Sequence, residues 1–363
     1  MFHPKPNFPA ELLQATCDQR VEYFSNGFIL EHEILKYINI SLEKKLLKPD
    51  LYQILLVTGP TGAGKTLVAL NALNTIYKNS HEQNLDTRLP AIYLETPKLG
   101  GNQFSWKGLY GRLLEAMMYP NLEHVRKVTH SEKEHNVKLY SAKNLSENQL
   151  RERVEERIKE LKVKVIILDE LQHMFAFTEA NVKTNLDVLK SIANITKCQM
   201  VLVGTYEGIS KIQWNGQLAR RTDKIHFHRY KLETEENRYQ FLLAYSGLLS
   251  HVCFDLDKNL LFENNITDVY MRCLGCIGIL KQMIEKSIAE LTIDQTLSHE
   301  MIVKNSLDVQ EIKQIYGEIE DGEAEFAQSD ISEVAKLMGL STAKVRKRSV
   351  RPGKMKPTRD PVR

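Results

Sequence analysis

One eight-residue segment of the sequence is compatible with few folds. It reads Gly59-Pro60-Thr61-Gly62-Ala63-Gly64-Lys65-Thr66 and matches the pattern G-x-x-x-x-G-K-[ST]. The apolar residues of Tyr52–Thr58 predict a strand before it, and Thr66–Tyr77 predicts a helix after it. In that context backbone N–H groups hold phosphate oxygens, Lys65 binds the β- and γ-phosphates, and the Thr66 hydroxyl binds Mg²⁺. The segment, the phosphate loop below, therefore predicts a site for ATP.

A second predicted strand, Val163–Asp169, ends in two carboxylates, Asp169 and Glu170. The carboxyl ends of parallel strands meet at one edge of a sheet, so we expect Asp169 near the phosphates, where it would hold the Mg²⁺ shell. Glu170 is then the expected general base for the attacking water, because hydrolysis needs an acceptor close to the γ-phosphate. The pair indicates an ATPase. We give no role to His173, which follows closely.

Three further positions could complete the site. Thr205 ends the predicted strand Met200–Thr205, where a hydroxyl could orient the water, sense the γ-phosphate or simply cap the strand. Arg220 or Arg221 could insert a guanidinium into the site of a neighbouring subunit, and the alternative is a solvated basic corner. Lys281 opens an amphipathic helix and could reach the nucleotide from there.

Apolar strands that alternate with helices predict an α/β fold with a parallel sheet covered by helices on both faces. The expected strands are residues 52–58, 91–96, 163–169, 200–205 and 224–228. Beyond residue 232 we expect only helices, over 234–249, 257–273, 278–291 and 299–307. The predicted organisation is a helical lead-in (1–50), the nucleotide-binding domain (51–231), a helical lid (232–308), an acidic linker (309–330), and a short helical pair with a basic tail (331–363).

The charges are concentrated in the C-terminal part of the chain. Residues 342–363 carry nine Lys or Arg and one acid, whereas residues 311–333 carry eight acids and one base. This pattern is typical of a tail that meets an anionic partner, usually nucleic acid; mutual neutralisation or disorder is the alternative. Within the tail, Ile331–Arg346 has helix-turn-helix spacing, which could serve DNA contact, docking of a partner, or neither.

Composition excludes several classes of protein. Apolar residues make up 42% and charged residues 26%, which excludes wholesale disorder. No apolar run approaches the ~20 residues that span a bilayer, and no secretory signal is visible. The five cysteines are odd in number and scattered, so we expect a cytoplasmic protein with no membrane partner. Cys273 and Cys276 are expected to be buried thiols, because a single C-x-x-C is a weak zinc signal.

With these residues assembled, the chain resembles the TnsC/TniB family of AAA+ ATPases, which regulate transposition. The resemblance covers roughly residues 15–290. It rests on the phosphate loop, on Leu168–His173 (similar to D-E-[AV]-[QH]-H in that family), on Val203–Thr205, on Gln217–Arg221 and on Arg20–Phe24.

The resemblance implies an AAA+ P-loop fold with ATP and Mg²⁺ as ligands. It implies a bacterial protein, associated with the nucleoid when bound to DNA, that forms rings or helical filaments with itself on double-stranded DNA. The other implied partners are a transposase and a target selector or CRISPR effector. It also gives Thr205 the first sensor role, Arg220 or Arg221 the finger role, and Lys281 the place of the arginine in G-x-x-R.

The candidate DNA contacts follow the predicted strand 91–96, where cations and flexible backbone would face the assembly axis. They are Lys98, Gly100, Gly101, Gln103, Trp106, Lys107 and Arg112. Two other functions stay open: an AAA+ ATPase of helicase loading or secretion, and a nucleotide-gated DNA scaffold with negligible hydrolysis.

Overall fold

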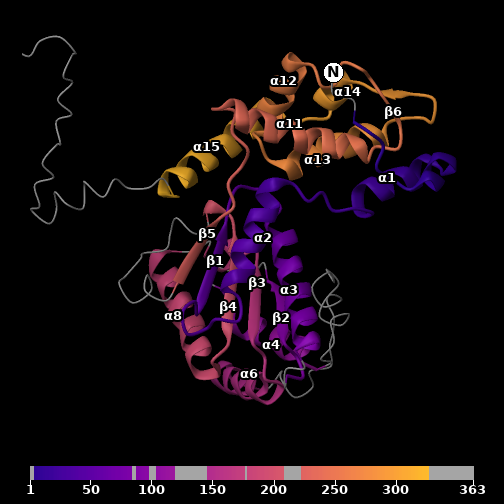
Figure 1. The fold of residues 1–363 in the computed structure, drawn as a ribbon. Coiled ribbons are helices and arrows are strands. Elements are labelled where there is room, and N and C mark those ends of the chain that lie inside the picture. The colour runs from indigo at the N-terminus through magenta and orange to yellow at the C-terminus, as the bar shows by residue number, and fades with distance from the viewer. Residues whose placement is uncertain are drawn as a thin grey trace, which may run out of the picture. The chain divides into compact units, whose positions relative to one another are not determined.

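A five-stranded parallel sheet in the order β2-β3-β4-β1-β5 forms the centre of the fold (Figure 1). This computed structural model describes residues 4–83, 87–97, 104–118, 145–175, 178–207 and 222–326. Every residue of β1, β3 and β4 is buried, as the unbroken apolar runs predict for strands covered on both faces. The five strands confirm the prediction to within two residues at each end. They are β1 (Ile54–Thr58), β2 (Ala91–Glu95), β3 (Val165–Asp169), β4 (Gln199–Gly204) and β5 (Thr222–His226).

The register of the sheet brings the predicted site residues to one edge. Thr58, the last residue of β1, lies opposite Gly204 on one side and His226 on the other. Glu95 at the end of β2 lies opposite Asp169 at the end of β3. The loops that follow β1, β3 and β4 therefore start side by side.

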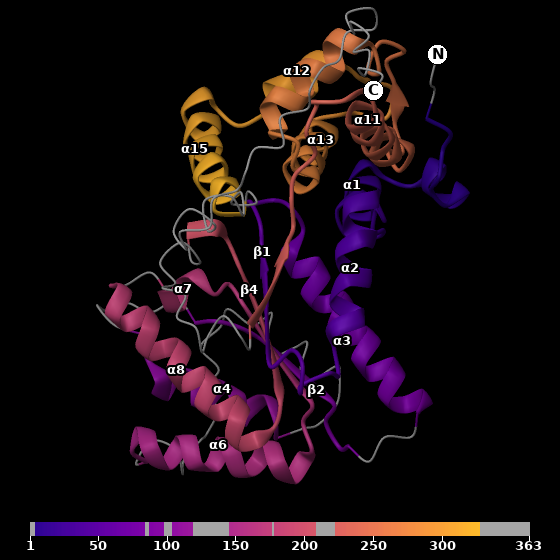
Figure 2. The same cartoon turned by 60° about the vertical axis from the view of Figure 1, so that its left-hand side comes forward.

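Helices cover both faces of the sheet (Figure 2). α2 and α3 lie on one face, and α4, α6 and α8 lie on the other. For α3, α4, α6 and α8, which connect parallel strands, right-handed connections require this arrangement. α6 begins at a capping box formed by Ser146 and Gln149. These helices are α2 (Glu33–Lys45), α3 (Lys65–Glu82), α4 (Trp106–Ala116), α6 (Glu147–Leu161) and α8 (Glu179–Thr196), with the short α7 (Gln172–Phe175) after β3.

The lid is helical as predicted, with two corrections. Residues expected to be free of strands form a small parallel pair, β6 (Asp255–Leu256) and β7 (Thr296–Leu297). The helix expected from residue 257 starts at Glu263, because the Asp257 carboxylate accepts the Asn259 N–H and closes a turn there. The lid helices are α11 (Glu235–Ser250), α12 (Glu263–Cys273), α13 (Ile277–Ala289) and α14 (His299–Lys304).

The N-terminal lead-in divides between the two parts of the fold. The short 3₁₀ helix η1 (Ala10–Gln14) precedes α1 (Cys17–Asn26), which packs against α13 of the lid, whereas α2 packs against α3. Arg20 of α1 adds a second contact with the lid: it is buried, and its guanidinium donates to the carbonyl of Cys253 after α11 (2.8 Å) and to the carbonyls of Leu13 (2.6 Å) and Ala15 (3.2 Å).

The segment expected to be an acidic linker is a helix from its start, α15 (Val309–Phe326). Ile312, Ile315 and Ile319 recur at helical spacing and form an apolar stripe. This spacing indicates an amphipathic helix, which a count of charged residues does not detect. Ile319 is 1% exposed. Residues 1–325 belong to one compact unit, and the residues after Phe326 lie outside the described part of the chain. No helix in the described ranges is long and apolar enough to span a bilayer.

Candidate functional site

The phosphate loop forms a closed turn between β1 and α3. Gly64, with φ of 102°, and Gly62, with φ of 75°, adopt left-handed backbone conformations that side chains disfavour. The Lys65 ammonium lies within this turn and donates to the Pro60 carbonyl at 2.8 Å. The turn thus brings the amino end of an 18-residue helix and a lysine to the same place. This is the arrangement that binds a phosphate anion.

The electrostatics of Lys65 favour an anionic ligand. Burial lowers the pKa of the ammonium to about 8, and the nearby Asp169 and Glu170 carboxylates oppose this shift. A phosphate group beside Lys65 would raise this pKa again, because an opposite charge at close range favours the charged form. The structure therefore brings together three of the predicted site residues.

The carboxylate of Asp169 is fixed from two sides. The residue is 2% exposed, and its carboxylate accepts from the Tyr93 hydroxyl at 2.9 Å and from the Glu170 N–H at 2.8 Å. Burial, assisted by Asp169, raises the pKa of Tyr93 well above its usual range, so this hydroxyl stays a donor. At the same edge of the sheet the hydroxyls of Thr58 and Thr96 are buried without a partner among the described residues.

Glu170 follows in an unusual conformation. Its φ is 54°, which lies in the left-handed region of backbone conformation. This conformation costs a non-glycine residue about 1–3 kcal/mol, and residues that adopt it are found often at functional sites. The Gln172 amide donates to the Glu170 carboxylate. The same Gln172 side chain accepts the Thr205 N–H at 3.4 Å, so Thr205 lies at this edge as expected.

Comparisons with known proteins agree with this geometry. A family model described as "AAA domain" matches residues 50–213. A solved structure, a Walker-type ATPase of Pyrococcus abyssi, is 14% identical, with 86% of this chain and 85% of that chain covered and a TM-score of 0.50. This chain has the AAA+ P-loop NTPase fold. The fold class predicted from the sequence is thereby confirmed.

Two other solved structures are similar at lower scores, both from Aeropyrum pernix. The ADP form of the ORC2 protein is 15% identical, with 79% of this chain and 71% of that chain covered and a TM-score of 0.48. The ORC1 protein in complex with DNA is 15% identical, with 87% and 74% covered and a TM-score of 0.48. The comparison with curated proteins gave no match.

The lid contacts the phosphate loop of the AAA domain directly. The Gly278 N–H in α13 donates to the Gly62 carbonyl at 2.8 Å. A Cβ at Gly278 would lie 2.5 Å from that carbonyl oxygen, so only glycine permits this approach. Cys276, at the N-cap of α13, also lies near Lys65. Nucleotide binding in the loop and the position of the lid are therefore physically linked.

Lys281 does not reach the phosphate loop. Its ammonium donates to the Ser25 carbonyl at 2.7 Å and lies 4.8 Å from the centre of the Phe28 ring. It thus joins α13 to the end of α1. The expected nucleotide contact is absent from this conformation of the described chain, and the lysine instead holds the lead-in on the lid.

Other predicted positions have mixed outcomes. Lys107 and Arg112 are on α4, and both are exposed, as a DNA contact requires. Trp106 instead is 8% exposed, and its indole N–H donates to Asn185 in α8 at 2.9 Å, so it belongs to the core. The rest of these candidates lie outside the described residues: Lys98, Gly100, Gly101, Gln103, Arg220, Arg221 and the tail from residue 331.

Cys273 and Cys276 are both buried, as predicted for structural thiols. Burial raises the pKa of Cys276 to about 12, which keeps the thiol protonated. Within the described part of the chain no group of three or more His, Cys, Asp or Glu side chains could hold a metal ion. The interpretation as buried thiols is preferred over a zinc site.

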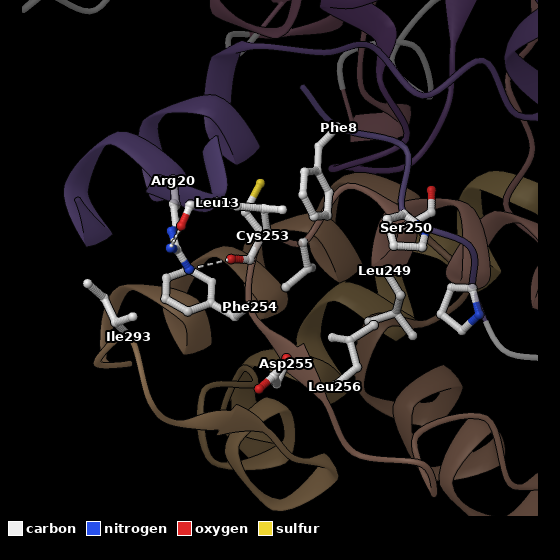
Figure 3. A pocket seen from close by; sticks show the side chains of 13 residues that line it. Phe8, Leu13, Arg20, Leu249, Ser250, Cys253, Phe254, Asp255, Leu256 and Ile293 are labelled. Atoms are coloured by element: carbon white, nitrogen blue, oxygen red, sulfur yellow. Dashed lines mark hydrogen bonds between the residues drawn. The ribbon is translucent and has the colours of Figure 1, made fainter. Parts of the chain in front are cut away.

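A cavity of about 320 Å³ lies away from the phosphate loop, between the N-terminal segment and the lid (Figure 3). Figure 3 shows Arg20 and Phe254 beside it, with the guanidinium donating to the Cys253 carbonyl. Three backbone carbonyls accept from this guanidinium, so most of its N–H donors are already satisfied. Arg20 therefore holds α1 on the lid, a role that its place in a sequence motif does not reveal.

α15 packs beside the phosphate loop. Ile315 and Glu318 line a narrow space with Pro60, Thr61 and Thr205. At its C-terminal end, Glu323 pairs with Arg229 and with Lys231, each at 3.1 Å. The expectation of a linker therefore missed a helix that contributes to the surroundings of the site.

Proposed function

We propose that this protein is an ATP-hydrolysing AAA+ switch that assembles on duplex DNA and regulates transposition. The observation that carries the ATPase part is the placement of Asp169 and Glu170 beside Lys65. The two carboxylates are at the carboxyl end of β3, which belongs to the same sheet as β1, the strand that leads into the phosphate loop. The DNA and transposition parts rest on the resemblance of Leu168–His173 and the other motifs to TnsC/TniB proteins.

The residues present suit Mg²⁺ as a ligand. Mg²⁺ prefers oxygen donors and is usually held by one or two protein groups together with phosphates, and Asp169 and Thr66 supply a carboxylate and a hydroxyl. When bound, Mg²⁺ neutralises charge on the phosphate oxygens. The buried carboxylate of Asp169 is already oriented by Tyr93 for this purpose.

The roles of the protein groups follow from their chemistry. Backbone N–H groups of the phosphate loop and the Lys65 ammonium bind the phosphates. The Glu170 carboxylate accepts a proton from the attacking water. Thr205 senses the γ-phosphate, and Arg220 or Arg221 of a neighbouring subunit completes the site, so that assembly depends on the bound nucleotide.

The test of the ATPase part is Glu170→Gln, with Glu152→Gln on the exposed face of α6 as the matched control. We expect ATP turnover to fall about 100-fold or more in Glu170→Gln while ATP binding persists, because a general base contributes that much. The control is expected to turn over ATP like the wild type. Normal turnover in Glu170→Gln would show that the base is another residue.

The test of the DNA part is electron microscopy of the protein with duplex DNA in ATP, a slow analogue and ADP. We expect rings or filaments with the first two and none with ADP. Binding should weaken steeply with salt, since phosphate contacts release counterions. A protein that stays monomeric and ignores duplex DNA in every nucleotide would refute this part. Transposase genes beside the gene would support transposition, whereas replication or secretion genes would favour another AAA+ process.

A further inference from the structure

Gln172 joins the ends of two strands through one side-chain amide. Its Nε2 donates to the carboxylate of Glu170, which follows β3, and its Oε1 accepts the N–H of Thr205, which follows β4. The first residue is the proposed base and the second is the proposed γ-phosphate sensor. A single side chain therefore touches both groups.

The surroundings hold Gln172 in this position. The Leu171 N–H donates to the Val203 carbonyl at 2.9 Å, which fixes the turn after β3 to the end of β4. Gly204 permits this approach, since a Cβ there would lie 3.0 Å from the Leu171 Cβ and 3.4 Å from the Gln172 Oε1. On the other side, the His173 imidazole is 3.0 Å from the Thr96 carbonyl after β2. The turn is thus attached to both neighbouring strands.

The chemistry of an amide suits this position. A neutral N–H donor orients a carboxylate without the strong stabilisation of its anion that a lysine or arginine would provide, so the basicity needed for proton transfer is retained. The same group offers a carbonyl to a backbone N–H, which neither a lysine nor an arginine can do. Glutamine therefore satisfies both contacts with one side chain.

We propose that Gln172 is a positioning residue that couples Thr205 to Glu170, so that contact of Thr205 with the γ-phosphate sets the position of the base. A shift of the Thr205 backbone changes the acceptor contact of the amide and, through it, the donor contact to the carboxylate. This inference rests on the proposed ATPase function.

The first test is steady-state ATP hydrolysis by Gln172→Met, which keeps the volume and removes the amide. Gln149→Ala on α6 is the control, because Gln149 only caps a distant helix. We expect kcat to fall about tenfold or more in Gln172→Met, within the contribution of a positioned base, and KM to stay within about twofold. Gln172→Glu keeps an acceptor for Thr205 but loses the donor to Glu170, and it should lose as much. An unchanged kcat in both variants overturns the proposal.

The second test needs no turnover. In protein labelled with ¹⁵N-threonine, the Thr205 amide signal is assigned with Thr205→Ser. We expect Glu170→Gln to shift this signal in the wild-type background and not in Gln172→Met. An equal shift in both backgrounds overturns the coupling. A wild-type protein without ATP turnover refutes the proposed function, and the labelled spectra still decide the role of Gln172.

Discussion

We expect Gly278→Ala, which adds a single methyl group, to break the contact between the lid and the phosphate loop. The added Cβ would lie 2.5 Å from the Gly62 carbonyl oxygen and 3.1 Å from its carbonyl carbon. The first distance is roughly 0.9 Å short of an ordinary contact, which begins at 3.4 Å. Both obstacles are backbone atoms of a loop whose glycine has φ of 75°, so neither can rotate away as a side chain would. α13 must therefore move.

Three contributions to the free energy of unfolding set the size of the effect. Overpacking costs about 1–3 kcal/mol. Breaking the 2.8 Å hydrogen bond from the Gly278 N–H costs about 0.5–1.5 kcal/mol. The higher helix propensity of alanine returns up to about 1 kcal/mol. Together these give a net destabilisation of about 0.5–4.5 kcal/mol, which at about 3 °C per kcal/mol lowers Tm by about 1.5–13.5 °C.

The assay is thermal unfolding together with the affinity for a fluorescent ADP analogue. Gly111→Ala in α4 is the matched control, because a Cβ there meets nothing within 4 Å. It should raise stability by up to about 1 kcal/mol through helix propensity alone. We expect weaker nucleotide binding only in Gly278→Ala, since its lid no longer contacts the loop. A Gly278→Ala protein with wild-type Tm and nucleotide affinity would refute the lid–loop contact.

Three further predictions concern other contacts. Lys65→Ala should weaken ATP binding about 10- to 100-fold, because a hydrogen bond to a charged group contributes that much to affinity, and should lower Tm little. Titration calorimetry measures the affinity and scanning calorimetry the Tm; an undiminished affinity would contradict the role of Lys65 in phosphate binding. Gly322→Ala should detach α15, because its Cβ would lie 2.1 Å from the Tyr206 ring, whereas the Cβ of Gly317→Ala meets nothing within 4 Å and should stabilise the helix. Hydrogen exchange over residues 309–323 distinguishes the two variants, and equal protection in both would argue against the contact of Gly322 with Tyr206. Burial lowers the pKa of His32 to about 4, below its ordinary value of 6.5, so the unfolded chain binds a proton first and stability should fall as pH drops from about 6.5 to 4. His32→Asn, which can still cap α2, should reduce this loss in unfolding measured against pH, and an unaltered slope would assign it elsewhere.

The sequence was sufficient for the features that depend on neighbouring residues. The phosphate loop and the Asp169-Glu170 pair are contiguous signals, because each needs a particular chemistry directly after a buried strand. The strands themselves were predictable, since residues buried on both faces of a parallel sheet are apolar without interruption.

Only the tertiary structure decided which distant residues meet. The contact of Gly278 with Gly62, the attachment of α1 to the lid through Arg20 and the bridge made by Gln172 join segments that no local pattern connects. Lys281 has the spacing of a nucleotide ligand, yet its partners are Ser25 and Phe28. Periodicity tells which face of an element is buried, but hydrogen bonds and close backbone contacts depend on how the elements are placed in space, and that placement results from the packing of the whole chain.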